Sequence, residues 1–339
     1  MSKTDRLSLA VDAGELRLPE TGSTVFLRAE PAGFLTRDLP VLCEQSFRPT
    51  HDRLADEGLN VSPRVETEDA GLVIVNATRS RAENLGNVAR GLAMLRSGGT
   101  LAVNGNKTDG IDSLVRQVGK ALPAASTWVK AHGRVSFFER PGALPAEAED
   151  WTAGAAPAKN EEGFWTMAGV FSPAGSDPGS HRLVEAFDKR VRGRVADLGA
   201  GWGWLSALAL HTCDKITGID LYEAERRALD CAERNVADPR AGFHWADVPS
   251  LPRMTEPYDT VICNPPFHQG RAAEPDLGAA FIATAARIMK PAATLFMVAN
   301  RQLPYEAALD ANFGHWKQLS ADRNFKVILA ARPKRRSGR

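Results

Sequence analysis

Residues 260–267, TVICNPPF, place an asparagine, two prolines and an aromatic residue directly behind an apolar run. Proline has a fixed φ and donates no backbone hydrogen bond, so Pro265 and Pro266 must lie where the strand predicted by that run has ended. The Asn264 side-chain carbonyl and the Pro265 backbone carbonyl can accept both hydrogens of a planar amino group, and Phe267 can stack on the flat molecule that carries it. The stretch therefore predicts a rigid platform that aims a poorly nucleophilic nitrogen at an electrophile.

A second motif, VADLGAGWG (195–203), is typical of a strand followed by a glycine turn. Gly199, Gly201 and Gly203 permit a tight turn in which a ligand can approach the backbone. Their spacing is G-x-G-x-G, whereas the loops that bind dinucleotides have G-x-G-x-x-G. Asp197, just inside the strand end, would repel a pyrophosphate and attract an ammonium or sulfonium group. These features favour a cationic ligand over a dinucleotide.

Two more acidic residues follow, each near the end of a further predicted strand. Asp220, in GIDL, stands at about the interval at which a ribose-binding acid is expected. Asp247, in WADV, can accept from an adenine amino group beside the apolar Val248. Either carboxylate alone is commonly a turn or cap residue. In this order behind the glycine turn, the two predict a ligand that carries a nucleoside.

The elements that position these residues alternate between short apolar or β-branched runs and segments with Ala, Leu and charges at helical spacing. Such alternation predicts parallel strands joined by crossover helices, in a doubly wound α/β sheet. Ligand sites in such sheets lie beyond the carboxyl ends of the strands. All the special residues above fall at such ends.

The two halves of the chain look alike, which predicts a duplicated domain. Three pairs of segments match in the same order: 72–78 with 260–266, 95–106 with 288–301, and 137–142 with 328–334. Asn76 falls opposite Asn264, but Ala77 and Thr78 replace the two prolines. No G-x-G-x-G follows the opening strand of the first half, so we expect that half to be degenerate.

The expected domains are residues 1–145, a linker over 146–163 that is rich in Pro, Ala, Gly and Glu, and a catalytic domain over 164–339. The 339 residues carry a net charge of +1, which gives no general sign of nucleic-acid binding. A basic end, ARPKRRSGR (331–339), is either a solvated tail or an arm that contacts phosphate.

Four scattered cysteines without a C-x-x-C pair indicate reduced thiols in a cytoplasmic protein and no zinc site. The first twenty residues contain no apolar stretch typical of a signal peptide, and no apolar run is long enough to cross a membrane. We therefore expect neither a membrane nor a metal as a partner.

The motifs DLGAGWG, GIDL, WADV and NPPF are arranged as in class I S-adenosylmethionine-dependent methyltransferases, and NPPF resembles the motif of those that methylate a planar nitrogen. Longer stretches, such as 169–187 and 298–314, resemble the bacterial ribosomal RNA guanine-N2 methyltransferases, the small subunit methyltransferase C and large subunit methyltransferase G family. The likeness is specific over 165–332 and loose over 20–142. The chain departs from the family pattern at Gln269 and at 291–293.

The resemblance implies two tandem methyltransferase-like domains, of which only the second keeps the cofactor site. It implies methyl transfer from S-adenosylmethionine to the exocyclic N2 of a guanine in ribosomal RNA of the small subunit, free or assembled. The residues implied to bind the cofactor are Phe171, Ser172, Asp197, Gly199, Ala200, Gly201, Gly203, Asp220, Leu221, Asp247, Val248 and Asn264. The residues expected to contact RNA are His268, Arg301, Tyr305, Arg332, Lys334, Arg335 and Arg336.

Other functions remain open at this point. The same chemistry serves adenine N6 and the side-chain nitrogen of a protein glutamine. A chain of another class, an RNA-binding ribosome assembly factor, would not need the intact glycine turn. The glycine spacing and Asp197 disfavour a nicotinamide dehydrogenase.

Overall fold

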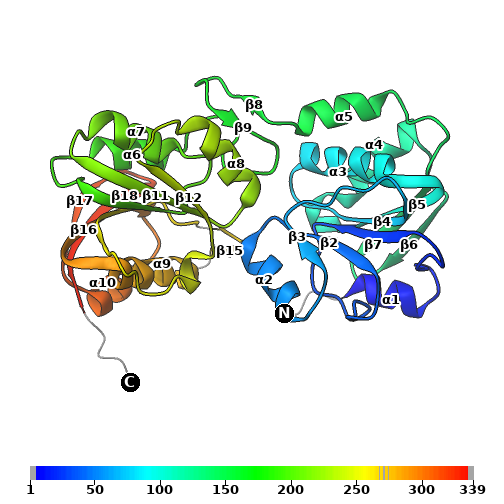
Figure 1. Cartoon of the computed structure of the whole chain (residues 1–339), viewed down its shortest axis with the longest axis horizontal. Coiled ribbons are helices and arrows are strands. Elements are labelled where there is room, and N and C mark those ends of the chain that lie inside the picture. The colour runs from blue at the N-terminus through cyan, green and yellow to red at the C-terminus, as the bar shows by residue number, and fades with distance from the viewer. Residues whose placement is uncertain (1–4, 267, 270–271, 274, 335–339) are drawn as a thin grey trace. The chain divides into compact units, whose positions relative to one another are not determined.

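The chain forms two compact α/β units, residues 1–157 with 167–169 and residues 158–166 with 170–339 (Figure 1). The computed structural model describes residues 5–266, 268–269, 272–273 and 275–334. Each unit is built on a seven-stranded sheet. The orders are β3-β2-β1-β4-β5-β7-β6 in the first and β12-β11-β10-β13-β16-β18-β17 in the second. The two orders match strand for strand, which confirms tandem Rossmann-like domains with mostly parallel sheets.

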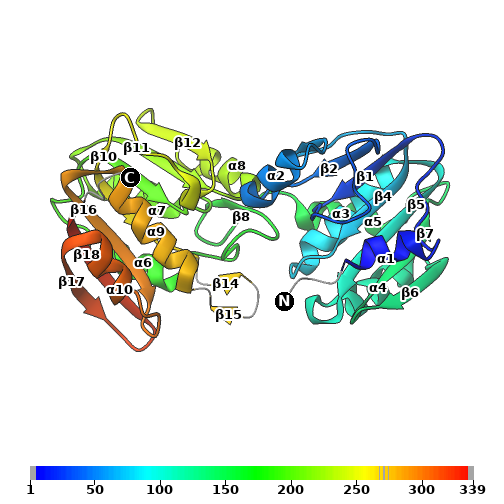
Figure 2. The same ribbon diagram turned by 90° about the horizontal axis from the view of Figure 1, so that it is seen from below.

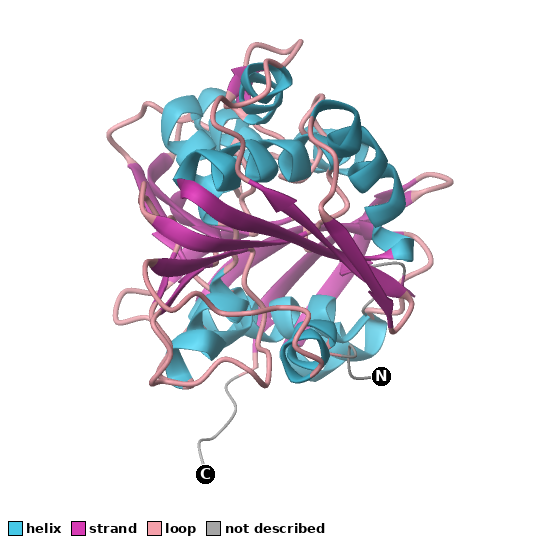
Figure 3. Ribbon diagram, turned by 90° about the vertical axis from the view of Figure 1, so that its right-hand side faces the viewer, coloured by secondary structure: helices cyan, strands magenta, loops and turns pink. Residues whose placement is uncertain are grey.

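In the first sheet the pairs are parallel except those that β7 makes with β5 and β6. Its strands are β1 (Ser23–Leu27), β2 (Val41–Glu44), β3 (Val61–Ser62), β4 (Ala70–Asn76), β5 (Leu95–Asn106), β6 (Ser126–Lys130) and β7 (Gly133–Glu139). Its helices are α1 (Arg6–Asp12), α2 (Arg48–Asp56), α3 (Arg81–Met94), the 3-10 turn η1 (Lys107–Asp109), α4 (Ile111–Ala121) and α5 (Glu147–Ala155). Figure 3 shows strands sandwiched between two helical layers. One core lies under α3, α4 and α5 and another under α1 and α2.

In the second sheet only the pairs that β18 makes with β16 and β17 are antiparallel. Its strands are β10 (Gly193–Leu198), β11 (Ile216–Glu223), β12 (Ala241–Trp245), β13 (Tyr258–Cys263), β16 (Met289–Asn300), β17 (Phe313–Ala321) and β18 (Phe325–Pro333). Two small hairpins pair β8 (Ala158–Lys159) with β9 (Trp165–Thr166) and β14 (His268–Gln269) with β15 (Ala272–Ala273). Figure 2 shows the second hairpin near the N-terminal end of helix α9.

Two helical layers cover this sheet as well. The helices are α6 (Pro178–Glu185), α7 (Trp204–Thr212), α8 (Arg226–Asn235), the 3-10 turn η2 (Val248–Ser250), α9 (Pro275–Ile288) and α10 (Glu306–Asn312). Helices α9 and α10 pack their apolar faces into one core, and α6, α7 and α8 lie on the other side of the sheet (Figure 1). Within the described part of the chain, no helix is long and apolar enough to cross a membrane.

The segment expected to be a linker is largely structured, and this expectation was wrong for residues 147–155. They form helix α5, whose Ala148 and Trp151 are buried in the core under α3 and α4. Burial of the large Trp151 ring gives the segment a fixed place in the fold that its Pro, Ala and Glu content does not reveal.

Candidate functional site

The side chain of Asn264 lies at the carboxyl end of β13, beside the end of β10. The register pairs Leu198 with Cys263, so Asn264 stands next to the glycine turn that follows β10. Its amide nitrogen donates to Asp177 Oδ2 at 3.0 Å and to Ser180 Oγ at 2.8 Å. Its Oδ1 atom is buried without a hydrogen-bond partner among the described residues. The amide therefore presents a fixed, unused acceptor.

The local sequence of α6 explains why Asp177 and Ser180 lie there. Asp177 is the N-cap, and its Oδ2 accepts from the backbone N–H of Ser180 at 3.0 Å. Pro178 occupies the first turn, where its missing N–H costs nothing. The cap thus fixes Asp177 Oδ2 and Ser180 Oγ at the N-terminal end of α6, where both accept from the Asn264 amide.

Asp197 is completely buried in β10, and only one of its carboxylate oxygens is satisfied. Ser206 Oγ donates to Asp197 Oδ2 at 2.7 Å, whereas Oδ1 has no partner within the described structure. Burial raises the pKa of Asp197 to about 7, against the lowering effect of the Ser206 hydrogen bond. A cation at Oδ1 would favour the ionised form and supply the missing partner.

The three glycines of the turn have different roles, although all have positive φ. A Cβ on Gly201 would meet nothing within 4 Å, and its N–H donates to Glu223 Oε2 at 2.7 Å. A Cβ on Gly203 would lie 2.9 Å from Val236 and 3.1 Å from Ala232, so this glycine allows α7 and α8 to pack closely. Gly201 is therefore where open space adjoins the turn, and Gly203 serves the fold.

Glu223, which sequence reasoning missed, replaces Asp220 as the acidic residue at the carboxyl end of β11. Its two carboxylate oxygens accept from the N–H groups of Gly201 and Glu225. Burial raises the pKa of Glu223, and these backbone hydrogen bonds oppose that rise. Glu223 is also the last residue of its strand, immediately before the turn into α8. That position was the available signal.

Asp220, the residue predicted to bind ribose, lies three residues inside β11. Its carboxylate accepts from His244 Nε2 at 2.9 Å, Tyr258 OH at 2.8 Å and Arg194 Nη2 at 3.0 Å. The hydrogen bond with His244 is the largest cause that lowers the pKa of Asp220 to about 2, and the hydrogen bonds from Tyr258 and Arg194 also lower it. They also occupy the carboxylate, so Asp220 ties neighbouring strands together within the sheet.

Of the remaining residues predicted to bind the cofactor, some have side chains buried in the core and one lies just beyond the end of a strand. Leu221 and Val248 are 0 % and 2 % exposed, which leaves only their backbone atoms for a ligand. Ala200 is also buried. Asp247 follows β12 and accepts from Ser250 Oγ at 2.5 Å. Asp247 thus lies at the predicted edge, two residues beyond the strand.

The segment before α6 contacts the glycine turn. The Phe171 carbonyl accepts from the indole of Trp202 at 2.9 Å, and Phe171 is 59 % exposed. Ser172 has a positive φ of 47° and donates to the Gly175 carbonyl at 2.7 Å. An exposed aromatic residue tied to the turn is available to cover a ligand.

The predicted RNA contacts are mostly not brought to this edge. Tyr305 is 1 % exposed and packs into the core, so its expected role as a surface contact was wrong. Arg332 and Lys334 lie at and just beyond the end of β18, which runs antiparallel to β16, so they are at the opposite edge of the sheet. Arg301 follows the carboxyl end of β16 and donates to the Asp322 carbonyl.

Several predicted residues cannot be placed with the others. Phe267, Arg335 and Arg336 lie outside the described residues. Pro265 is buried and Pro266 is exposed, as expected for a stiff turn after the strand. His268 begins β14, and the structure describes no more than its backbone. The platform is thus described at Asn264, Pro265 and Pro266.

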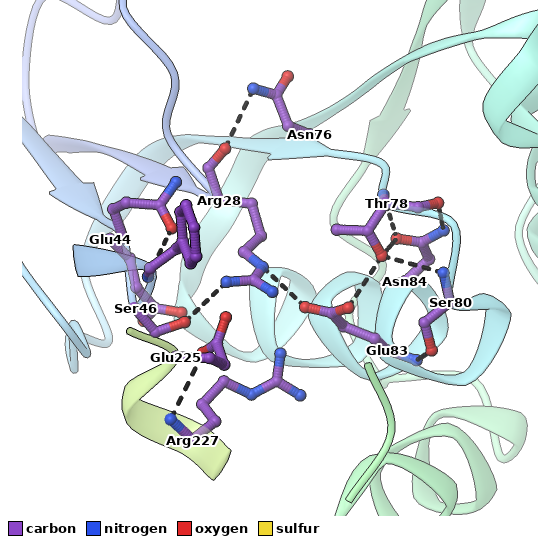
Figure 4. Close-up of polar contacts among 12 residues, drawn as sticks. Arg28, Glu44, Ser46, Asn76, Thr78, Ser80, Glu83, Asn84, Glu225 and Arg227 are labelled. Atoms are coloured by element: carbon purple, nitrogen blue, oxygen red, sulfur yellow. Dashed lines mark hydrogen bonds and ion pairs between the residues drawn. The ribbon is translucent and has the colours of Figure 1, made fainter. Parts of the chain in front are cut away.

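The equivalent edge of the first sheet is filled by its own side chains (Figure 4). The register pairs Leu27 with Val75, just as Leu198 pairs with Cys263, so Arg28 stands where the second unit has Gly199. Arg28 has a positive φ of 54°. By the same register, Phe26 replaces Asp197.

Arg28 closes this edge by pairing within the first unit. Its Nε lies 2.7 Å from Glu83 Oε1, and its Nη1 donates to Ser46 at 2.7 Å. Asn76 donates to the Arg28 carbonyl and accepts from Asn104 at 2.7 Å, so its oxygen is already used. The edge therefore has no carboxylate at the position of Asp197 and no unused oxygen on Asn76.

Comparison with known proteins gives the class. The family described as methyltransferase small domain matches residues 161–329. The chain is 30 % identical over 187 residues to ribosomal RNA small subunit methyltransferase C of Cronobacter sakazakii, covering 51 % of this chain and 54 % of that protein. It is 24 % identical over 356 residues to that of Erwinia tasmaniensis, covering 96 % and 98 %. The chain spans about half the length of the first of these curated relatives and nearly all of the second.

Among solved structures, the chain resembles the T. thermophilus 16S ribosomal RNA N2 methyltransferase determined with AdoMet and guanosine. The TM-score is 0.79 at 24 % identity, covering 93 % of this chain and 90 % of that one. This likeness shows the shared fold of two tandem domains.

The second unit, with its glycine turn and the acidic residues around it, is a methyltransferase domain, and residues 161–329 belong to the methyltransferase small domain family. Within that class it is similar to ribosomal RNA small subunit methyltransferase C, which confirms the resemblance seen in the sequence.

Proposed function

We propose that the chain transfers a methyl group from S-adenosylmethionine to the exocyclic N2 of a guanine in small-subunit ribosomal RNA. The observation that carries this proposal is the Asn264 amide, which has both hydrogens bonded within the fold and its oxygen left over. An acceptor locked in this way suits a planar amino group, because it can hold one N–H in a fixed direction.

The residues around the glycine turn fit S-adenosylmethionine. The unpartnered Oδ1 of Asp197 suits the ammonium of the methionine moiety. The open space at Gly201 admits a ligand to the backbone, and Glu223 beside it can accept from ribose hydroxyls. Asp247 remains our candidate for the adenine amino group. When bound, S-adenosylmethionine supplies an electrophilic methyl group on a sulfonium.

The chain's own residues prepare the nucleophile. Asn264 Oδ1 and the Pro265 carbonyl each accept one hydrogen of the guanine amino group, which directs the nitrogen lone pair toward the methyl carbon. Pro265 and Pro266 restrict the backbone, so the acceptors need little reorganisation. Phe267 is proposed to stack on the base. The methylated nitrogen then loses a proton to water, so the mechanism requires no strong general base.

A base in a helix cannot reach these acceptors, so the target guanine must be unpaired or turned out of its stack. The relatives are named for ribosomal RNA, which supports ribosomal RNA as the substrate. A protein that acts on ribosomal RNA is proposed to work in the cytoplasm. Within the described residues, no group of three or more His, Cys, Asp or Glu could hold a metal ion. The mechanism above uses none.

We propose that residues 164–339 form the catalytic domain and that residues 1–145 form a degenerate domain that holds no cofactor. The closure of its strand edge by Arg28 and Glu83 supports this division of roles. The degenerate domain would then position RNA or stabilise its neighbour.

The proposed function is tested by incubating purified protein with labelled S-adenosylmethionine and ribosomal RNA or small subunits from a strain that lacks the protein. Digestion to nucleosides should give N2-methylguanosine from a single position. N6-methyladenosine, or label in protein glutamine, would instead support the alternative planar amines. Binding of RNA without transfer by a protein that binds the cofactor would contradict the proposal.

A further inference from the structure

The first unit contains a pocket of about 400 Å³ on its helical surface. Helices α3, α4 and α5 form it, and its lining includes Arg81, Arg116, Lys120, Gln117 and Glu147. All belong to one compact unit, so the pocket is a property of this domain alone.

The helical spacing of α4 creates one wall of the pocket. Arg116 and Lys120 are four residues apart and lie on one exposed face. The opposite face of the helix carries Ile111, Leu114 and Val118, which are buried in the core. The apolar face fixes the rotation of α4, and the two cations therefore point outward together.

The lining of the pocket carries an excess of positive charge. Three cations stand against one carboxylate, that of Glu147. Among the described residues, no carboxylate forms an ion pair with Arg81, Arg116 or Lys120. This is not the general character of the domain, because residues 1–150 hold 18 Lys and Arg against 20 Asp and Glu. The positive potential is thus local.

Arg81 is held in place by a neutral partner. Its Nε donates to Gln117 Oε1 at 2.6 Å, which links the start of α3 to α4. A guanidinium held by an amide keeps its full charge and its terminal N–H groups, whereas one held by a carboxylate is neutralised. Such a fixed fork suits the oxygens of a phosphate.

We propose that this pocket binds phosphate groups of the RNA substrate and holds the RNA while the second domain acts on a base. The proposal rests on the proposed function for its choice of RNA. Contacts of this kind position a nucleic acid and carry no sequence information. They supply affinity that falls with salt, because each phosphate contact releases counterions.

The test uses the full chain with Arg116→Glu and Lys120→Glu combined. The matched control is Arg17→Glu with Arg53→Glu, two exposed cations of the same unit outside the pocket. RNA affinity is measured by fluorescence anisotropy on small-subunit ribosomal RNA at salt concentrations from about 50 to 200 mM. Methyl transfer is measured at saturating S-adenosylmethionine. Circular dichroism and thermal melting check the fold of each variant.

The pocket variant should bind RNA at least roughly tenfold more weakly and show a salt slope smaller by about one to two. Its KM for RNA should rise in proportion while kcat stays unchanged, and the control should match the wild type. If the charge reversals disturb folding, Arg116→Gln with Lys120→Gln should show the same direction with a smaller loss.

Unchanged affinity and salt slope in folded pocket variants would overturn the inference, as would an equal loss in the control. The binding assay does not depend on catalysis. If wild-type protein transfers no methyl group but the pocket variant loses RNA affinity, the inference stands and the proposed function fails. If methyl transfer occurs and RNA affinity does not depend on the pocket, the proposed function stands and the inference about the pocket fails.

Discussion

Asn264 donates an amide hydrogen to Asp177 Oδ2 at 3.0 Å, across 87 positions of sequence, and so the N-cap of α6 sets the orientation of the platform. Ser180 takes the other hydrogen. A free asparagine amide can turn over, which exchanges its donor for its acceptor. Here a flipped amide would aim its oxygen at Asp177 and present a donor to the substrate, so the two partners exclude that state.

Asn264→Ala should lower kcat by about 10²–10³, because the acceptor that directs the amino group is lost from a preorganised site. The affinity for S-adenosylmethionine should change little, since Asp197 and Glu223 remain. Single-turnover methylation with saturating cofactor, alongside calorimetric binding, checks both. Unchanged turnover would discredit the platform.

Ser180→Ala should lower kcat by roughly five- to tenfold, the effect of one lost hydrogen bond of about 1 kcal/mol to the Asn264 amide. The N-cap survives, because it uses the backbone N–H of Ser180. The matched control is Ser176→Ala, whose hydroxyl bonds to Glu162 and makes no contact with Asn264. Steady-state kinetics with both variants give the comparison.

Asp177→Asn is a conservative test of the hydrogen bonds that hold the Asn264 amide in one orientation. The side-chain oxygen of an asparagine at this position can still cap α6 and accept from Asn264, so activity should remain within about threefold. Asp177→Ala should lose both the helix cap and the hydrogen bond that Asn264 donates to Asp177. Equal activity of the alanine and asparagine variants, at equal thermal stability, would show that Asp177 does not position Asn264.

Asp197→Asn should stabilise the ligand-free protein at pH 8 by roughly 2–4 kcal/mol, because the folded-state pKa of Asp197 is raised from 3.8 to about 7. Between these two values the folded chain binds a proton that the unfolded chain does not. The free energy of unfolding therefore falls as pH rises from about 4 to 7, and the variant should lack this contribution. Urea titrations at pH values of about 5 and 8, on either side of the folded-state pKa, measure it.

The same carboxylate predicts the pH dependence of cofactor binding. Wild-type affinity for S-adenosylmethionine should increase as pH rises through about 7, when Asp197 ionises and attracts the ammonium group. Asp197→Asn should bind weakly at every pH. A wild-type affinity that is flat over about one pH unit on either side of that value would exclude this role.

Glu223→Gln should weaken cofactor binding by about 10- to 100-fold, the range for a lost hydrogen bond to a charged group. Asp220→Asn should leave that affinity nearly unchanged and lower the melting temperature, because Asp220 serves Arg194, His244 and Tyr258. Calorimetry and thermal melting of the two variants separate the roles. The opposite pattern would restore Asp220 as the ribose acid.

The first domain should hold no cofactor, so calorimetry should give one site per chain. Arg28→Gly should not create a second site, because Phe26 still replaces the buried carboxylate. It should instead destabilise the domain by roughly 3 kcal/mol, since Glu83 keeps a buried charge without its main partner. Adding Glu83→Gln should recover part of that loss. A stoichiometry of two would refute the proposed degeneracy.

Local pattern was sufficient for much of the fold. The alternation of apolar runs with helical segments, and three pairs of matching segments, predicted two doubly wound domains of one design, and the sheet orders agree. The positions of Asn264 and Asp197 at strand ends also followed, because prolines and glycines mark where a strand stops. These properties depend on neighbours within a few residues.

Other features needed long-range contacts. Asp220 was chosen from its interval behind the glycine turn, whereas the hydrogen bond between the Gly201 N–H and Glu223 exists only in the folded chain. The supposed linker became a helix because Trp151 finds a buried place against α3.

The sequence alone predicted a stiff platform at Asn264, beside a carboxylate at Asp197 and a glycine turn. Residue types and their spacing along the chain are sufficient for these predictions. Only the tertiary structure decided which way the Asn264 amide faces and that Arg28 closes the first domain. Those outcomes depend on partners far away in sequence, whose distance and burial exist only once the sheet and helices have packed.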